Sequence, residues 1–350
     1  MAPPTTNRKL TYSVPASDLD LIEEELPPLL ANEILIKVHA AAINPVDTQL
    51  WRSQLTAVVK VPGGKGMGRD FSGTVVEVGT AVRDWAIGED IFGLYFQALG
   101  NGTFSEYISL NPSSEPVAKK PASLSHEDAA SLPLVALTAF ACLEWLPVPT
   151  TSQRRVIVRG ASGGTGSWVV QLAKEVYDCH VTAICSGKNS EYVRKLGADE
   201  IIDYGTQPVP ETLLKTKEKL AREYDLLVDC VGGTELLEAH STFLHNKGGY
   251  ITIVGDKTSV QTLGGPITYL TNPAMILRYI RGYIWGPRYA CISFSTQSSY
   301  LTKVVSLAER AELRIEIQEV IRDTFDGGWR RAIELIESAR VRGKVVLLIP

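Results

Sequence analysis

The sequence predicts an α/β protein of two domains, one rich in β-strands and one built on a doubly wound parallel sheet. Over the first ~120 residues, short alternating apolar runs are separated by Gly and Asn, which is typical of a compact, barrel-like β domain. From Ser125 onward, strand and helix patterns alternate over about 150 residues, as they do in a parallel sheet covered by helices. The length of 350 residues fits about two such domains.

The strands expected in the first domain are short. They are 34–40, 71–78, 91–94 and 104–110. Near the end of the chain, a helical pattern over 328–339 leads into an apolar strand at 344–349. Such a tail often returns to the first domain, so we expect that domain to be discontinuous. The expected division is 1–125 with 291–350 for the first domain, and 126–290 for the second.

The second domain begins with a helix signal at Ser125. A Ser cap with Asp128 three residues later precedes a long apolar run, which predicts one long helix. The apolar run 266–285 carries Arg278 and Arg281, so we expect a partly buried helix or an interface there. The expected strands are 156–158, 181–185, 200–202, 226–230 and 250–254, and the helices between them are 166–176, 190–196, 211–223 and 235–243.

A glycine-rich turn links the first strand and helix of this series. It contains Gly160, Gly163, Gly164 and Gly166. Glycines let the backbone turn tightly and bring N–H groups close to a pyrophosphate, and the helix N-terminus adds a partial positive charge. The spacing G-x-x-G-G-x-G differs from the standard G-x-G-x-x-G, and an ordinary turn is the alternative. The strand before the turn and the helix after it favour a dinucleotide site.

The residues after the second strand decide between the two nicotinamide dinucleotides. An acidic residue about twenty positions past the glycines would accept hydrogen bonds from a ribose 2′-hydroxyl. The chain has no acidic residue between Asp178 and Glu191, and it has Ser186 and Lys188 at this place. A hydroxyl and an ammonium would hold a 2′-phosphate by charge-assisted hydrogen bonds. The pattern favours NADPH, and the alternative is that Lys188 is a solvated lysine in a turn.

The composition limits the other classes of function. A net charge of −4 gives no reason to expect nucleic acid or an anionic membrane as a partner. Five cysteines without a C-x-x-C pair indicate buried thiols of a reducing compartment. The N-terminus has no apolar signal segment, and the apolar run 132–143 is too short to span a bilayer. We expect a cytoplasmic protein without a membrane span, and a mitochondrial address stays open.

Several short motifs occur in order along the chain. They are Ala42-Ile-Asn-Pro-Val-Asp47, Gly68-Arg-Asp-Phe-Ser-Gly73, Leu137-Thr-Ala139, Lys195-Leu-Gly-Ala-Asp199, Tyr224-Asp-Leu-Leu-Val-Asp-Cys230 and Arg342-Gly-Lys-Val-Val346, together with the glycine turn. Through the order and spacing of these motifs, the chain resembles the zinc-free quinone oxidoreductase branch of the medium-chain dehydrogenase/reductase superfamily. The segment 275–289 is similar to the reticulon-interacting protein group of that branch. The resemblance implies a GroES-like domain from both chain ends, an inserted Rossmann domain and, commonly, a homodimer.

The resemblance also implies site residues, matched motif by motif. Asn44, in Asn-Pro-x-Asp, matches the residue that approaches the nicotinamide, and Thr138 matches one near the nicotinamide ribose and phosphates. Thr165 replaces the usual Val of the pyrophosphate loop. The other implied cofactor contacts are Ser162, Gly163, Gly164 and Gly166 at the pyrophosphate, Ser186, Lys188 and Tyr204 at the 2′-phosphate, Val231 and Val254 just beyond strand ends, and Lys344 near the closing strand.

The zinc-dependent members of the superfamily use their metal to polarise an oxygen atom. They need a Cys near the position of Asn44 and a Gly-His-Glu at the position of Gly68. This chain has Asn44 and Gly68-Arg-Asp70 there, and no cysteine precedes Cys142. The histidines also lack the spacing of zinc ligands. We therefore expect no metal and no ordinary alcohol oxidation.

These inferences lead to the hypothesis of a reductase that transfers hydride from NADPH to a quinone or an α,β-unsaturated carbonyl. Such acceptors are already electrophilic and need positioning more than a metal. The catalytic candidates are Asn44 and Tyr95; Tyr95 is a proton donor or substrate contact, or else a barrel aromatic. For Arg52 and Asp47 we favour structural roles, with Arg52 paired to Asp47 or Asp70. The alternatives are a cofactor-binding scaffold with little turnover and an atypical zinc alcohol dehydrogenase.

Overall fold

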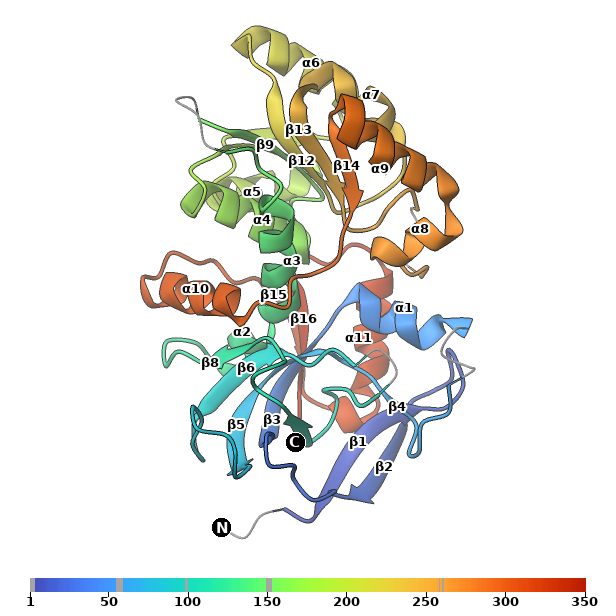
Figure 1. Cartoon of the computed structure of the whole chain (residues 1–350), viewed down its shortest axis with the longest axis vertical. Coiled ribbons are helices and arrows are strands. Elements are labelled where there is room, and N and C mark those ends of the chain that lie inside the picture. Colours follow the sequence, from blue (N-terminus) through green and yellow to red (C-terminus); the bar gives the residue numbers. More distant parts are fainter. Residues whose placement is uncertain (1–3, 55–58, 98–99, 149–152, 258, 260) are drawn as a thin grey trace. The chain divides into compact units, whose positions relative to one another are not determined.

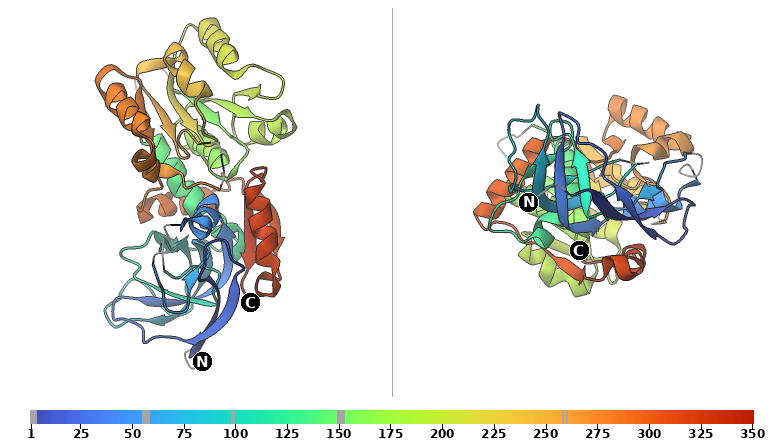
Figure 2. Two further views of the ribbon diagram at one scale, coloured as in Figure 1. Left: turned by 90° about the vertical axis from the view of Figure 1, so that its right-hand side faces the viewer. Right: turned by 90° about the horizontal axis from the view of Figure 1, so that it is seen from below.

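The two ends of the chain build one structural unit, and the middle of the chain builds another. The computed structural model describes residues 4–54, 59–97, 100–148, 153–257, 259 and 261–350. Unit 1 comprises Met1–Leu137 with Thr296–Pro350, and unit 2 comprises Thr138–Ser295. Figure 2 shows both chain ends in unit 1. The expected boundary after residue 125 differs from this division, because the helix that directly follows Ser125 packs on strands of unit 1.

Unit 2 contains a six-stranded sheet in which every neighbouring pair is parallel. Its order is β11-β10-β9-β12-β13-β14. The chain thus starts at the centre of the sheet, moves to one edge and then to the other, which is the doubly wound arrangement that the sequence predicted. The strands are β9 Arg155–Arg159, β10 His180–Cys185, β11 Glu200–Asp203, β12 Tyr224–Asp229, β13 Leu244–Thr252 and β14 Arg288–Cys291.

Helices cover this sheet, and several of them bury apolar side chains in its core (Figure 1). In α4, the residues from Gly166 to Ala173 are all buried, so this helix is packed on both sides. Apolar side chains of the strands, such as Ile157 and Leu227, meet Phe243 and Leu213 of the helices in one core. The helices are α4 Gly164–Glu175, α5 Ser190–Lys195, α6 Val209–Leu220, α7 Glu235–Phe243, α8 Thr268–Thr271 and α9 Pro273–Trp285.

Unit 1 contains a small sheet and a larger one, both mainly antiparallel. The small sheet has the order β2-β1-β4, and the larger has the order β15-β16-β3-β5-β6-β8 with β7 paired to β3. The C-terminal strand β16 returns to this unit as expected, where Val345 pairs with Ile43. The strands are β1 Thr6–Tyr12, β2 Asp20–Glu25, β3 Ile34–Ile43, β4 Lys65–Gly66, β5 Asp70–Val78, β6 Asp90–Leu94, β7 Tyr107–Leu110, β8 Val117–Lys119, β15 Ile317–Ile321 and β16 Lys344–Leu348.

The single long helix expected after Ser125 is wrong. The structure has two helices, α2 His126–Ala130 and α3 Pro133–Leu143. The break follows from Pro133, which lacks an N–H donor and disfavours a helical conformation at the residue before it. The expected cap is present, since the Asp128 N–H donates to Ser125 Oγ at 3.0 Å. The further helices of unit 1 are α1 Pro45–Arg52, α10 Ser298–Glu309 and α11 Gly328–Glu337.

Across the parts of the chain that the structure describes, no helix has the length and apolar character needed to cross a bilayer. The apolar run that ends at Trp285 forms α8 and α9, and it is partly buried as expected.

Candidate functional site

The glycine turn after β9 holds the start of α4 very close to the strand. Gly160 has φ of +78°, a conformation that suits glycine. A Cβ on Gly166 would lie 2.1 Å from the carbonyl oxygen of Gly160, so only a glycine permits this approach. The N–H groups of Gly160 and Ala161 donate to the Ile184 carbonyl at 3.1 and 3.2 Å. The turn is therefore tied to the end of β10 as well as to its own helix.

The N-terminus of α4 presents donors rather than side chains. Gly163 is the N-cap, with φ of −81°, and it provides no side-chain cap. A Cβ there would meet only the Gly160 oxygen at 3.5 Å, an ordinary contact, so the space beside it is open. The N–H groups of the first turn, those of Gly164, Thr165 and Gly166, have no acceptor within the helix. This turn therefore fits an anionic diphosphate, as the sequence predicted.

The residues expected at the 2′-phosphate lie at the carboxyl ends of two paired strands. Cys185 of β10 pairs with Asp203 of β11, and the next residues along the chain are Ser186 and Tyr204. The Tyr204 N–H donates to the Cys185 carbonyl at 3.3 Å. Tyr204 and Lys188 are exposed, and Ser186 is half-buried. A hydroxyl, an ammonium and a phenol thus lie at one edge of the sheet, which fits a phosphate monoester.

A carboxylate that the sequence reasoning missed lies at the same edge. Asp203 Oδ2 approaches so closely that a Cβ on Gly187 would be 2.4 Å from it. The Asp203 carboxylate accepts hydrogen bonds from the Gly205 N–H at 3.0 Å and from the Thr206 hydroxyl at 3.2 Å. The segment after β10 has no acidic residue before Glu191, whereas Asp203 lies at the end of the neighbouring strand β11. Parallel pairing of the two strands is the signal that would have found it.

The loops after β9 and β10 are also joined by a side-chain bond. The Asn189 amide donates to Ser162 Oγ at 2.9 Å. Sequence reasoning selected Ser162 but not Asn189, because nothing in the spacing of the two residues indicates their contact. This bond fixes the Ser162 side chain beside the glycine turn.

The loop after β12 is held by a buried carboxylate. Asp229 Oδ1 accepts hydrogen bonds from the N–H groups of Val231 at 2.9 Å and Gly232 at 3.0 Å, and Asp229 Oδ2 accepts one from the Tyr250 hydroxyl at 2.6 Å. The Val231 side chain is exposed and lies over the glycine turn, since a Cβ on Gly160 would be 3.0 Å from it. The end of β12 thus brings Val231 to the glycine turn, and its contact with a cofactor stays a prediction.

Val254 and Thr138 occupy different surroundings. Val254 follows β13, where its N–H donates to Thr252 Oγ1 at 3.2 Å, and its side chain is half-buried against the loop of Gly232. Thr138 lies within α3 and is buried.

Unit 1 contains a buried polar cluster around Asn44, at the start of α1. Its members, Asn44, Asp47, Arg69, Asp70 and Lys344, are all buried. The Asn44 amide donates to Asp70 Oδ2 at 2.8 Å, while Asn44 Oδ1 accepts from the Lys344 ammonium at 2.5 Å. Lys344 also lies 3.0 Å from Asp70 Oδ2 and donates to the Ile43 carbonyl. These contacts fix which end of the Asn44 amide faces which partner.

The carboxylate of Asp47 closes the first turn of α1. Its Oδ2 accepts from the Asn44 N–H at 2.7 Å, which is the return bond of a capping box. Burial raises the pKa of Asp47 to about 6, although the nearby Arg69 guanidinium and the Asn44 N–H act to lower it. Burial lowers the pKa of Arg69, which donates to the carbonyls of Gly66 and Gly68. The expected structural role of Asp47 is thus a helix cap.

The residues at the positions of the zinc ligands do not fit a zinc ion. Zinc takes thiolate, imidazole or carboxylate ligands. Here the Asn44 side chain is hydrogen-bonded to Asp70 and Lys344. Arg69 is a buried cation that donates hydrogen bonds to backbone carbonyls. The guanidinium and the ammonium are donors without lone pairs for a metal. Among the described residues, no group of three or more His, Cys, Asp or Glu side chains is placed to hold a metal ion.

Two expectations for unit 1 need revision. Arg52 does not pair with Asp47 or Asp70; it forms a bidentate ion pair with Glu337 of α11 and stacks on Trp51. Sequence separation hid this partner, because α11 lies at the other end of the chain. Tyr95 is only 3% exposed and packs in the core of unit 1, and burial together with the charge of Glu115 raises its pKa to about 12. This placement fits the alternative of a barrel aromatic.

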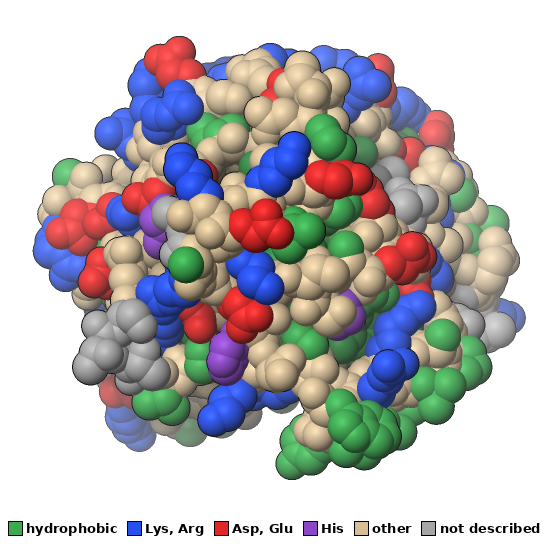
Figure 3. All heavy atoms as spheres, turned by 90° about the horizontal axis from the view of Figure 1, so that it is seen from above, with side chains coloured by type: hydrophobic (Ala, Val, Ile, Leu, Met, Phe, Trp, Pro, Cys, Tyr) green, Lys and Arg blue, Asp and Glu red, His purple; other side chains and the backbone are tan. Residues whose placement is uncertain are grey.

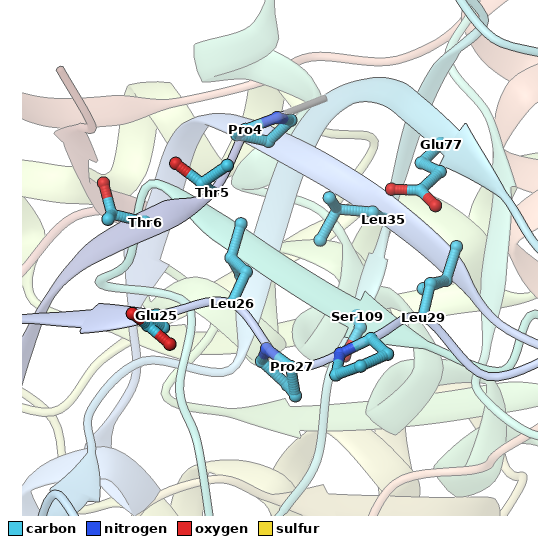
Figure 4. Close-up of a pocket in the computed structure, with 11 residues that line it drawn as sticks. Pro4, Thr5, Thr6, Glu25, Leu26, Pro27, Leu29, Leu35, Glu77 and Ser109 are labelled. Atoms are coloured by element: carbon cyan, nitrogen blue, oxygen red, sulfur yellow. The ribbon is translucent and has the colours of Figure 1, made fainter. Parts of the chain in front are cut away.

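A shallow cavity of about 450 Å³ lies elsewhere in unit 1. Figure 4 shows Leu26, Leu29 and Leu35 around it, with the carboxylates of Glu25 and Glu77 at its sides. None of its lining residues belongs to the expected site. Acidic side chains would repel an anionic dinucleotide, so this cavity does not fit the cofactor.

Two sequence families match the chain. Residues 30–122 match the family described as "Alcohol dehydrogenase GroES-like domain", and residues 196–347 match the family described as "Zinc-binding dehydrogenase". The chain is 35% identical over 337 residues to the Bos taurus protein "NAD(P)H oxidoreductase RTN4IP1, mitochondrial". The aligned region covers 90% of this chain and 81% of that protein. The Homo sapiens counterpart is 34% identical with the same coverage.

The chain belongs to the medium-chain dehydrogenase/reductase superfamily, among its quinone oxidoreductase-like members.

Within this superfamily the chain is RTN4IP1-like. A solved quinone oxidoreductase from Coxiella burnetii has the same fold, with a TM-score of 0.77 and 25% identity over 99% of this chain and all of that one. The GroES-like domain and the Rossmann domain are therefore confirmed. The chain is therefore a member of a superfamily of oxidoreductases, and it has Asn44 and Arg69 at the positions where zinc ligands are expected in zinc-dependent members.

Proposed function

We propose that the protein is a zinc-independent reductase that uses NADPH to reduce a quinone or an α,β-unsaturated carbonyl. The single observation that carries the proposal is the carboxyl edge of the unit 2 sheet. There the open N-terminus of α4 stands beside a second group of donors formed by Ser186, Lys188 and Tyr204. The first group suits a diphosphate and the second suits a further phosphate, and NADPH carries both. NADPH supplies a hydride when bound.

The contribution of unit 1 is a fixed amide rather than a metal. Asn44 is oriented by Asp70 and Lys344, and we propose its backbone and amide as contacts of the nicotinamide end. Quinones and α,β-unsaturated carbonyls accept hydride without a Lewis acid because their carbon atoms are already electron-poor. We propose water as the proton source, because Tyr95 is buried in the core. The similarity to an NAD(P)H oxidoreductase and to a quinone oxidoreductase supports this reaction class.

Calorimetry and rapid mixing test the function directly. We expect NADPH to bind the purified chain and to be oxidised on mixing with quinones or α,β-unsaturated ketones, but not with simple ketones. The absorbance of the reduced nicotinamide reports turnover. If NADPH binds but is oxidised by none of these quinones and α,β-unsaturated ketones, the scaffold alternative is favoured. A zinc equivalent that co-purifies, together with activity lost to a chelator, would favour the alcohol dehydrogenase alternative.

The choice of NADPH over NADH depends on Lys188. In Lys188→Glu we expect this preference to fall by roughly tenfold to a hundredfold, because a charge-assisted hydrogen bond to the 2′-phosphate is lost and a like charge replaces it. In Asp203→Asn we expect the preference to rise, since a carboxylate beside the same site is neutralised while an oxygen remains for the turn. The measurement is the ratio of dissociation constants for the two dinucleotides.

The matched control is Lys247→Glu, which makes the same change of charge at an exposed lysine within β13. We expect it to leave the ratio unchanged. If Lys188→Glu behaves like this control, the assignment of the 2′-phosphate site is wrong, and the glycine turn alone remains as evidence for a dinucleotide.

A further inference from the structure

The glycine turn has few side chains with which to hold an anion. Within 160–166 it has no Lys or Arg, and its polar side chains are the hydroxyls of Ser162 and Thr165. Arg159 precedes the turn, but it donates to the Gly232 carbonyl at 2.8 Å and pairs with a glutamate of α7. A diphosphate at the turn would therefore depend on backbone N–H groups and on these two hydroxyls.

The charge of the rest of the molecule adds little attraction for an anion. The net charge of the chain is −4. On the face of the molecule in Figure 3, Lys and Arg side chains are mixed with Asp and Glu side chains. Because the net charge does not draw a diphosphate to the protein, the affinity depends on the direction of each donor at the turn.

The Ser162 hydroxyl is held by one donor. A hydroxyl both donates and accepts hydrogen bonds, and Ser162 Oγ accepts one from the Asn189 amide at 2.9 Å. Among the described residues, no protein acceptor takes the Ser162 proton. The hydroxyl can therefore donate that proton to a ligand. A neighbour that only accepted hydrogen bonds would take the proton for itself.

Asn189 makes this bond instead of a more common one. It is the N-cap of α5, a position where an Asn side chain usually accepts a hydrogen bond from the first turn of the helix. Asn189 makes no such bond. Its backbone is fixed, because the Asn189 N–H donates to the Ser186 carbonyl at 2.9 Å within one turn of 3₁₀ helix. The side chain is thus directed to the glycine turn rather than to its own helix.

We propose that Asn189 is a positioning residue for the dinucleotide, which directs the Ser162 hydroxyl proton to the diphosphate. The proposal rests on the function proposed above, since NADPH supplies the diphosphate. An amide can present its nitrogen or its oxygen to Ser162, and an anion that needs the Ser162 proton favours the nitrogen. Lys188 precedes Asn189 in the same loop, so one loop would serve both the 2′-phosphate and the diphosphate.

The variant that tests this role is Asn189→Asp. A carboxylate has nearly the shape of the amide, but it accepts hydrogen bonds and donates none. The Ser162 hydroxyl must then donate to the carboxylate and is lost as a donor to the diphosphate. We expect the variant to fold, because Asp is a favoured residue at a helix N-cap and still bonds to Ser162.

Calorimetry of the full chain with NADPH, NADH and ADP measures the effect as a double-mutant cycle. In the otherwise wild-type protein, we expect Ser162→Ala to raise each dissociation constant by about tenfold to a hundredfold, the effect of a lost hydrogen bond to a charged group. In the Asn189→Asp background, we expect Ser162→Ala to change it by less than about twofold. In the Asn189→Ala background we expect an intermediate factor, since the hydroxyl then rotates freely.

The matched control is Gln207→Glu, which makes the same change from amide to carboxylate at an exposed residue after β11. In this background we expect Ser162→Ala to keep its full effect. Thermal unfolding without ligand checks for a merely structural role, and we expect it to change little in Asn189→Asp.

Equal effects of Ser162→Ala in the Asn189→Asp and Gln207→Glu backgrounds would overturn the role of Asn189 and leave the proposed function intact. Failure of the wild-type protein to bind any of the three nucleotides would overturn both.

Discussion

Replacing Lys344 by Met is expected to lower the free energy of unfolding of unit 1 by about 3–5 kcal/mol, the cost of breaking a buried ion pair by removing one partner. Asp70 is fully buried and its carboxylate lies 3.0 Å from the Lys344 ammonium. Methionine keeps most of the side-chain length but removes the charge. Among the described residues, Asp70 then keeps the side-chain hydrogen bonds from the Asn44 amide and the Leu134 N–H, neither of which carries a charge.

Urea unfolding followed by amide hydrogen exchange measures this effect where it arises. We expect protection to fall in β3 and β16 while β9 and β10 of unit 2 stay protected. In the double variant Asp70→Asn with Lys344→Met, we expect much of the lost stability to return, because no unpaired charge remains. The control is Lys195→Met, which removes a lysine from the exposed pair with Glu191; such pairs contribute little. Equal losses in Lys344→Met and Lys195→Met would contradict the role of the buried cluster.

Replacing Gly166 by Ala is expected to destabilise unit 2 by about 3 kcal/mol, at the upper end of the usual cost of overpacking. The added Cβ would lie 2.1 Å from the Gly160 oxygen and 2.8 Å from the Gly160 carbonyl carbon. Both are backbone atoms and cannot move aside like the end of a side chain. α4 must therefore shift away from β9, and we expect NADPH binding to be lost with it. Thermal unfolding and calorimetry measure the two effects.

Gly163→Ala is the matched variant three residues earlier. Its φ of −81° suits alanine, and the new Cβ would make only one ordinary contact. We expect stability to be unchanged or about 0.4–1 kcal/mol higher, since the unfolded chain loses freedom. We also expect the affinity for NADPH to fall at least tenfold, because the methyl group enters the space where a pyrophosphate would approach. Undiminished affinity in Gly163→Ala would contradict the placement of the pyrophosphate at α4.

The parts of the fold that the sequence predicted are those governed by local pattern. Five of the six strands of unit 2 lie at apolar runs in a pattern of alternating strands and helices, so periodicity finds them. The sixth, β14, was not expected, because its four residues, Arg288–Cys291, include no β-branched side chain. The return of the C-terminal strand was expected as well, and β16 pairs with β3. The strands β1 and β2 were not expected, because β2 carries four acidic residues in six and resembles a solvated segment. They form because β1 binds both β2 and β4.

The parts of the site that escaped sequence reasoning depend on contacts between distant segments. Asp203 reaches the edge of the sheet from the neighbouring strand, and Asn189 fixes Ser162 across two loops. Arg52 was expected to use a carboxylate nearby in the sequence, yet Glu337 lies closer in space. Motif matching selects positions one at a time, so it cannot show which side chain holds another in place.

Lys344 illustrates the same limit. Its motif predicted a residue near the cofactor, and the structure shows a buried ammonium enclosed by Asn44, Asp70 and the Ile43 carbonyl. The sequence could not show that the Lys344 ammonium donates hydrogen bonds to the side chains of Asn44 and Asp70. Its position as a cofactor contact stays a prediction, and its role in orienting Asn44 follows from the hydrogen bonds.

The interruption of unit 1 by unit 2 has a consequence for how the protein is made. The ribosome delivers β3 early and its neighbour β16 last, after all of unit 2 has emerged. During synthesis the residues from Ala40 to Ile43 therefore wait with one strand edge unpaired, and such edges attract other chains. This edge of β3 would have to be kept from other chains until Lys344–Leu348 is translated, and a stop codon shortly before Lys344 would leave unit 1 without β16 although unit 2 is complete.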